Sequence, residues 1–160
     1  ALSEVLRGAR AATRRPIFVK LSPTLPQLGD AARVAVDAGA DGITVINTIP
    51  GLVVDVERRR PVLGFGSGGV SGPGLLAVGV LATWRVRQAV SVPIIGVGGV
   101  QCATDVLQYI IAGATVVGVG TAALVDPKLP ARLVKELTAW CREHRVARLA
   151  DLIGTLEWPR

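Results

Sequence analysis

The chain has 160 residues, the usual size of a single domain. Half of these residues are hydrophobic but only 4% are aromatic, so valine, isoleucine, leucine and alanine must supply the core. This composition favours parallel β-strands that are buried on both faces. The net charge is +6, but no aromatic or polar base-reading side chains are interleaved with the arginines, so we do not expect nucleic-acid binding.

Cysteine usage and hydropathy exclude two further classes of protein. Cys102 and Cys141 are far apart and lack the spacing of a metal site or a disulfide framework, and no signal peptide is visible, which predicts a cytoplasmic protein. The 20 residues over 106–125 carry no charge and could span a bilayer by length. Their glycines, threonines and Gln108 divide them into helix, turn, strand and loop, so we expect no membrane span.

The first third of the chain reads as a basic helix followed by two strands with a helix between them. Pro16 ends the first helix, and Pro26 and Gly39 stand where the second is expected to begin and end. Apolar residues between them recur at helical spacing. We predict a helix over 3–15, a strand over 17–21, a helix within 26–39 and a strand over 42–46.

Residues 48–71 form a long irregular stretch, and loops of this length inside a compact fold are usually functional. A short hairpin is predicted there, between 53–56 and 61–63. The charged run over 55–60 is expected to be solvated or to lie at a subunit contact rather than to act in catalysis.

The remaining elements complete a fourfold alternation of strand and helix. We predict helices over 73–89, 103–112, 129–144 and 146–153, and strands over 93–97 and 114–119. Alternation of this kind indicates a parallel sheet with right-handed crossovers. Four units cannot close a barrel of eight strands and leave two apolar edges. We therefore predict an α/β fold, the C-terminal half of a TIM (βα)8 barrel: residues 1–160 form one partial domain, and the N-terminal half is absent. A small open α/β sheet is the alternative.

Two glycine motifs follow the last two predicted strands. Gly98-Gly99 and Gly120-Thr121 can bring several backbone N–H groups together, which is what a phosphate requires, and Thr121 adds a hydroxyl. Either pair alone could be a tight turn. Two pairs on successive strands favour a phosphate site.

Other polar or glycine-rich positions lie at the remaining strand ends. Lys20 sits in an apolar strand, where a charge needs an anion or a polarised ligand, although it could instead extend to solvent. Beside a flavin it could stabilise negative charge. Asn47 and Thr48 can read a polar ring or simply form a turn. The loop containing Gly72 can lie flat against a ligand or be a flexible turn.

The ordered motifs together resemble the dihydroorotate dehydrogenase family, over about residues 16–127. The resemblance rests on Val-Lys-Leu-Ser-Pro, Gly-Ala-Asp-Gly-Ile-Thr-Val-Ile-Asn-Thr, Arg-Arg-Pro, Gly-Gly-Val-Ser-Gly-Pro, Pro-Ile-Ile-Gly-Val-Gly-Gly-Val and Val-Gly-Thr-Ala. The Asn-Thr strand end with Ser-Gly-Pro is similar to class 1, and nearer its NAD-linked 1B branch than the quinone-linked class 2.

The resemblance implies an FMN-containing barrel that oxidises (S)-dihydroorotate to orotate in pyrimidine biosynthesis. By motif, Lys20 and Ile46 would contact the flavin ring and Gly72 would lie against it. Asn47 and Thr48 would hold the substrate. It further implies a homo-oligomer and, in the 1B branch, an iron–sulfur and FAD subunit that passes electrons to NAD. The FMN phosphate would be held by Gly98, Gly99, Gly120 and Thr121.

The chain departs from the family in two places. Residues 74–79 are wholly apolar where the family carries a basic side chain. The family's catalytic base is a cysteine or serine on an upstream loop, so it is expected before residue 1, and no residue here is assigned as catalytic or as a metal ligand. The alternatives are the FMN domain of dihydropyrimidine dehydrogenase and a non-catalytic phosphate-binding half-barrel.

Overall fold

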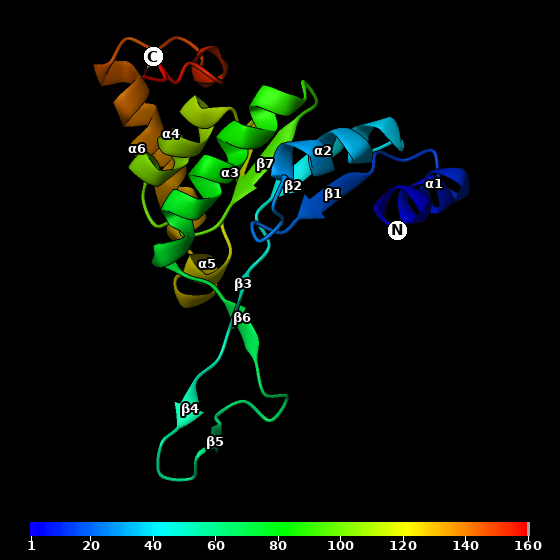
Figure 1. Ribbon diagram of the computed structural model, residues 1–160. Helices are drawn as coiled ribbons and strands as arrows, with labels where there is room; N and C mark the ends of the chain where they lie inside the picture. The colour runs from blue at the N-terminus through cyan, green and yellow to red at the C-terminus, as the bar shows by residue number, and fades with distance from the viewer. Residues whose placement is uncertain (160) are drawn as a thin grey trace.

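A four-stranded parallel sheet forms the centre of the computed structural model, which describes residues 1–159 (Figure 1). Its strands are β1 (Phe18–Leu21), β2 (Gly42–Val45), β7 (Ile94–Val97) and β8 (Val116–Gly118), in the spatial order β1-β2-β7-β8. All three neighbouring pairs are parallel. The predicted α/β class is therefore confirmed, and each strand lies within a predicted strand range.

Five helices cover one face of this sheet (Figure 1). They are α1 (Leu2–Ala12), α2 (Leu28–Asp37), α3 (Leu76–Ala89), α4 (Ala103–Ala112) and α6 (Leu129–Glu143), and each contacts the next in this order. Every second residue of each strand points toward these helices, because side chains alternate between the two faces of a strand. Val19, Ile43 and Ile94 are accordingly buried.

The opposite face of the sheet is open within the described residues. Lys20, Thr44, Ile95 and Val116 lie side by side across the four strands on this face. Phe18 is 43% exposed and Val116 54% exposed, although both are large apolar residues in strands. In a (βα)8 barrel this face is the packed interior, so the exposure fits the predicted half-barrel.

Helix ends agree with the sequence in part. Ala40 N–H bonds to Ala35 C=O at 3.0 Å and Gly39 N–H to Val36 C=O at 2.9 Å, the two bonds of the predicted glycine cap. Helix α2 begins at Leu28 rather than beside Pro26. Helix α1 ends at Ala12, short of the predicted residue 15, because Thr13 adopts extended backbone.

Three stretches outside the parallel sheet differ from prediction. A 3-10 turn, η1 (Pro73–Leu75), precedes α3, and the last predicted helix shrinks to the 3-10 turn η2 (Leu149–Leu152). A short helix, α5 (Thr121–Val125), occupies what was expected to be a loop. The uncharged run over 106–125 is thus shared among α4, β8 and α5, and among residues 1–159 no helix has the length and apolarity to cross a membrane.

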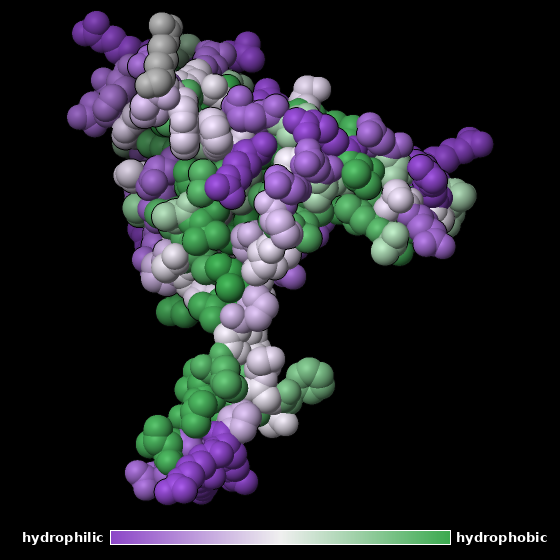
Figure 2. Space-filling model, in the orientation of Figure 1, coloured by the Kyte–Doolittle hydropathy of each residue, from purple (hydrophilic) through white to green (hydrophobic). Residues whose placement is uncertain are grey.

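Residues 49–70 project from the body as an arm (Figure 1). β3 (Ile49–Gly51) pairs with β6 (Gly68–Val70), and farther out β4 (Val54–Asp55) pairs with β5 (Arg60–Pro61), both antiparallel. The outer pair confirms the predicted hairpin, whereas the inner pair was not predicted. Many apolar side chains on the arm are exposed, and Figure 2 shows them as green patches above a hydrophilic tip.

Candidate functional site

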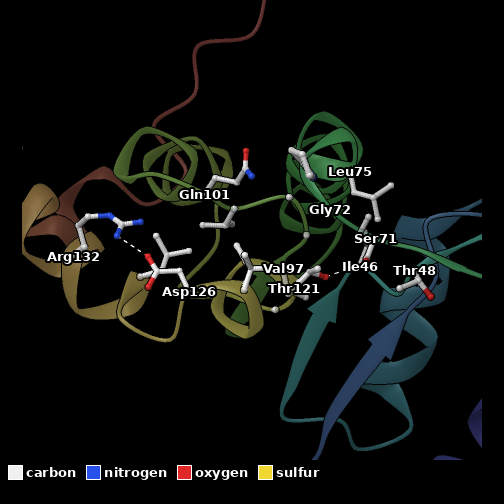
Figure 3. A pocket seen from close by; sticks show the side chains of 18 of the residues that line it. Ile46, Thr48, Ser71, Gly72, Leu75, Val97, Gln101, Thr121, Asp126 and Arg132 are labelled. Atoms are coloured by element: carbon white, nitrogen blue, oxygen red, sulfur yellow. Dashed lines mark hydrogen bonds and ion pairs between the residues drawn. The ribbon is translucent and has the colours of Figure 1, made fainter.

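A cavity of about 440 Å³ opens at the carboxyl ends of the four parallel strands (Figure 3). Its walls come from Lys20 near the end of β1 and from segments at or after the ends of β2, β7 and β8, which is where parallel barrels place their working groups. A volume of this size lies within the range of small-molecule sites. The lining is mostly apolar, with a few polar groups from the strand-end loops.

The cavity brings together all of the predicted site residues except Asn47. Lining it are Lys20, Ile46, Thr48, Gly72, Gly98, Gly99, Gly120 and Thr121. Asn47 is exposed, and its backbone N–H donates to the Leu21 carbonyl at 3.0 Å, which ties the end of β2 to β1. The parallel topology therefore gathers motifs that lie up to a hundred residues apart in sequence.

The two glycine loops supply backbone donors to this cavity. Within residues 1–159, the N–H groups of Gly99, Gly120 and Thr121 donate to no backbone carbonyl. Gly99 has φ +76°, and a methyl group there would run into the backbone nitrogen and Cα of Leu76. The first loop is thus packed directly on the start of α3. A methyl group at Gly120 would meet no atom within 4 Å, so that loop faces open space.

A side-chain hydrogen bond connects the base of the arm to the second glycine loop. The Thr121 hydroxyl donates to the Ser71 hydroxyl at 2.9 Å, across 50 residues of sequence (Figure 3). Both residues line the cavity. The bond therefore fixes the segment that contains Gly72 relative to the loop that follows β8.

The charges around the cavity do not repel an anion. Among residues 1–159, the one carboxylate that lines the cavity is Asp126, which pairs with Arg132 at 2.7 Å (Figure 3). The hydrogen bond from Arg132, followed by one from the Lys128 N–H, holds the pKa of Asp126 below its usual value. The carboxylate is therefore ionised and its charge is neutralised by Arg132. Lys20 adds a positive charge from β1 that has no acidic partner among residues 1–159.

The N-terminus of α4 is already occupied by the chain's own carboxylates. Asp105 accepts hydrogen bonds from the N–H groups of Gln101 (2.8 Å) and Cys102 (3.1 Å). Glu136 accepts one from the N–H of Ala103 at 3.2 Å. The N–H groups of Gln101, Cys102 and Ala103 are therefore already paired within the chain. No cluster of metal-ligating side chains occurs within residues 1–159.

Sequence reasoning missed several polar groups that line the cavity. They are Ser71, Gln101, Asp126 and Arg132. The pairing of Arg132 with Asp126 leaves no periodic signal in the sequence, because six residues separate the two and this is not helical pair spacing. The Asp126-Pro127 pair before α6 was the available signal, because acidic residues and prolines gather at helix starts.

Comparison with known proteins places the chain in a family. A family model described as dihydroorotate dehydrogenase matches residues 1–140. Two curated relatives are named dihydroorotate dehydrogenase B (NAD(+)), catalytic subunit. The one from Pelobacter propionicus is 43% identical over 96% of this chain and 51% of its own length. The one from Desulforudis audaxviator is 45% identical over 94% of this chain and 49% of its own.

A solved structure gives the same result. The crystal structure of DHODH from Eimeria tenella in complex with ferulenol superposes with a TM-score of 0.78 at 28% identity, covering 96% of this chain and 47% of that one. The chain spans about half the length of the curated relatives it matches. Its four βα units correspond to half of the TIM barrel of that structure. The chain belongs to the dihydroorotate dehydrogenase family.

Proposed function

We propose that this chain forms the FMN-holding part of an enzyme that oxidises (S)-dihydroorotate to orotate in pyrimidine biosynthesis. The observation that carries the proposal is the cavity, whose walls are built from the same strand-end motifs that resemble the family. The names of the relatives support the substrate.

The glycine loops suit the phosphate end of FMN. Within the described residues, the N–H groups of Gly99, Gly120 and Thr121 have no backbone acceptor, and the one carboxylate that lines the cavity is neutralised by Arg132. Backbone donors of this kind bind phosphate well, since glycine allows close approach. Gly98, Gly99, Gly120 and Thr121 would hold the phosphate.

The residues at the other end of the cavity suit the flavin ring. Ile46 is buried and would pack against the ring beside Gly72, where a methyl group would meet nothing within 4 Å. Lys20 would place its ammonium group where it stabilises negative charge on the ring. When bound, FMN supplies the redox chemistry, and the protein positions and polarises it. Asn47 and Thr48 would hold the pyrimidine.

The relatives are about twice as long as this chain. We accordingly assign the proton-abstracting base to a segment preceding residue 1, and none of the 160 residues to that role. The relatives are named as catalytic subunits that use NAD. A separate iron–sulfur and FAD subunit that delivers electrons to NAD is therefore part of the proposal.

The arm supports self-association of this chain. Leu52, Val56 and Phe65 are 59%, 76% and 97% exposed, although two-stranded ribbons are at best marginally stable by themselves. The run over 55–60 carries both Asp55 and Glu57 and three arginines. Two arms packed about a two-fold axis would cover the apolar side chains and set Glu57 of one copy against arginines of the other, while Asp55 pairs with Arg58 of its own arm at 3.7 Å. A second copy of the chain is the occupant we propose.

Anaerobic visible spectroscopy of the protein that contains this chain tests the function. The spectrum is recorded before and after addition of dihydroorotate, and separately of dihydrouracil. We expect flavin absorption bands that bleach with dihydroorotate. Bleaching with dihydrouracil alone would favour the dihydropyrimidine dehydrogenase alternative, and a protein purified without flavin bands that gains none with added FMN would contradict the cofactor.

A pair of lysine variants tests the proposed role of Lys20 beside the flavin. Lys20→Met removes the cavity's lysine, whereas Lys135→Met removes an exposed lysine of α6 that does not line the cavity. We expect the reduction potential of the bound flavin to fall in Lys20→Met and to stay unchanged in Lys135→Met. Equal potentials in both variants would remove Lys20 from its proposed role.

A further inference from the structure

One buried tyrosine lies directly behind the first glycine loop. Tyr109 comes from α4, has no exposed surface and does not line the cavity. Its hydroxyl donates a hydrogen bond to the carbonyl of Gly98 at 2.8 Å. The bond joins a core side chain to the backbone of a loop that does line the cavity.

Two glycines from other elements make room for this side chain. A methyl group at Gly79, inside α3, would collide with the Tyr109 hydroxyl. A methyl group at Gly96, in β7, would collide with its ring. Glycine weakens a helix relative to alanine, so Gly79, within α3, needs a packing reason. The fit of the tyrosine provides that reason.

The geometry of the peptide bond links this contact to the cavity. The Gly98 carbonyl and the Gly99 N–H belong to one planar peptide, and in a trans peptide they point in opposite directions. Because the carbonyl points at buried Tyr109, the N–H points away from the tyrosine, and both glycines line the cavity. This N–H has no backbone acceptor among residues 1–159.

We propose that Tyr109 is a positioning residue for phosphate binding: its hydroxyl holds the Gly98-Gly99 peptide in the orientation that presents the Gly99 N–H to the phosphate of FMN. The inference rests on the proposed function and deepens it. Burial, with a further contribution from Asp105, raises the pKa of Tyr109, so the hydroxyl keeps the proton it donates at any physiological pH. Without this bond, glycine's wide conformational range would let the peptide rotate.

The test compares two ligands that differ only in the phosphate. Dissociation constants for FMN and riboflavin are measured by quenching of flavin fluorescence on the flavin-free protein that contains this chain. Tyr109→Phe keeps the ring and removes only the hydroxyl. We expect FMN affinity to fall by about tenfold, the effect of losing one well-placed hydrogen bond to a charged group, while riboflavin affinity is unchanged.

A matched control separates this effect from general loosening of the core. Thr83 is equally buried, and its hydroxyl bonds to the Gly79 carbonyl at 2.9 Å within α3. Thr83→Val removes a buried hydroxyl bond without touching the loop, and should leave the ratio of FMN to riboflavin affinity as in the wild type. A second variant, Gly79→Ala, displaces the Tyr109 hydroxyl while improving the helix, and should show the same selective loss as Tyr109→Phe.

The outcomes distinguish the inference from the function on which it rests. If the wild-type protein binds FMN more tightly than riboflavin and both Tyr109→Phe and Gly79→Ala keep that ratio, the role of Tyr109 is refuted and the function stands. Equal losses for the two ligands would also refute it, since they would show a merely structural role. If the wild-type protein binds neither ligand, both proposals fail.

Discussion

Replacing Gly99 by alanine should destabilise the protein more than any comparable glycine change at the cavity. The new methyl group meets two obstacles. Gly99 has φ +76°, a backbone conformation that residues with a Cβ atom rarely adopt. The methyl group would also collide with the backbone of Leu76 at the start of α3. Strain of the first kind costs about 1–3 kcal/mol. Forcing the half-buried backbones of Gly99 and Leu76 apart adds about 1–3 kcal/mol more.

Two neighbouring glycines separate these contributions. Gly72 has φ 99° and ψ −174°, but a methyl group there meets nothing within 4 Å, so Gly72→Ala should show the strain alone, about 1–3 kcal/mol. Gly74 has neither obstacle. Gly74→Ala should therefore be neutral or stabilise by about 0.4–1 kcal/mol through the unfolded chain.

Urea unfolding of the three variants, compared with the wild-type protein, gives the free energies of unfolding directly. We expect a loss of about 2–6 kcal/mol for Gly99→Ala, a smaller loss for Gly72→Ala, and none for Gly74→Ala. A Gly99→Ala protein as stable as Gly74→Ala would refute the packing of this loop on α3.

Three further predictions concern other parts of the chain. Asp41 accepts hydrogen bonds from the Ile17 N–H (2.7 Å) and from Arg10 (2.8 Å), and these bonds lower its pKa. The ionised carboxylate should therefore stabilise the fold fully above the usual pKa of aspartate, and this stabilisation should vanish as the pH falls through the lowered pKa. In unfolding experiments, Asp41→Asn should be less stable than the wild type at neutral pH and equally stable in acid. Asp105→Ala removes the carboxylate that caps α4 and should lower the free energy of unfolding by about 1 kcal/mol, and an unchanged value would contradict the capping. Phe65→Ser on the arm should weaken self-association in sedimentation experiments without lowering the melting temperature, since its side chain is 97% exposed, and undiminished association would contradict the arm interface.

The parallel sheet could be predicted from sequence because its signals are local. Prolines and glycines mark the ends of apolar runs, and a strand of a buried parallel sheet can be recognised from such a run alone. That the motifs lie near one another could be predicted from topology, since the carboxyl ends of parallel strands meet at one edge. Lys20 and Thr121 could thus be placed in one site without any measured distance.

The parts that escaped prediction depend on contacts between distant residues or on very short elements. Helix α5 has five residues, too few to show helical periodicity. The inner strands of the arm contain Ile49-Pro50-Gly51 and Gly68-Gly69-Val70, which show neither alternation nor typical strand composition. The meeting of Gly79, Gly96 and Tyr109 is set by how α3 and α4 pack on β7, and each residue by itself looks ordinary in sequence.

A crystal structure of the protein that contains this chain, grown with FMN, tests the central claim most directly. We expect the FMN phosphate against the loops of Gly98-Gly99 and Gly120-Thr121, accepting the N–H of Gly99, with the flavin ring beside Lys20 and Ile46. A phosphate bound at another place on the chain, or a flavin ring outside the cavity, would contradict the account.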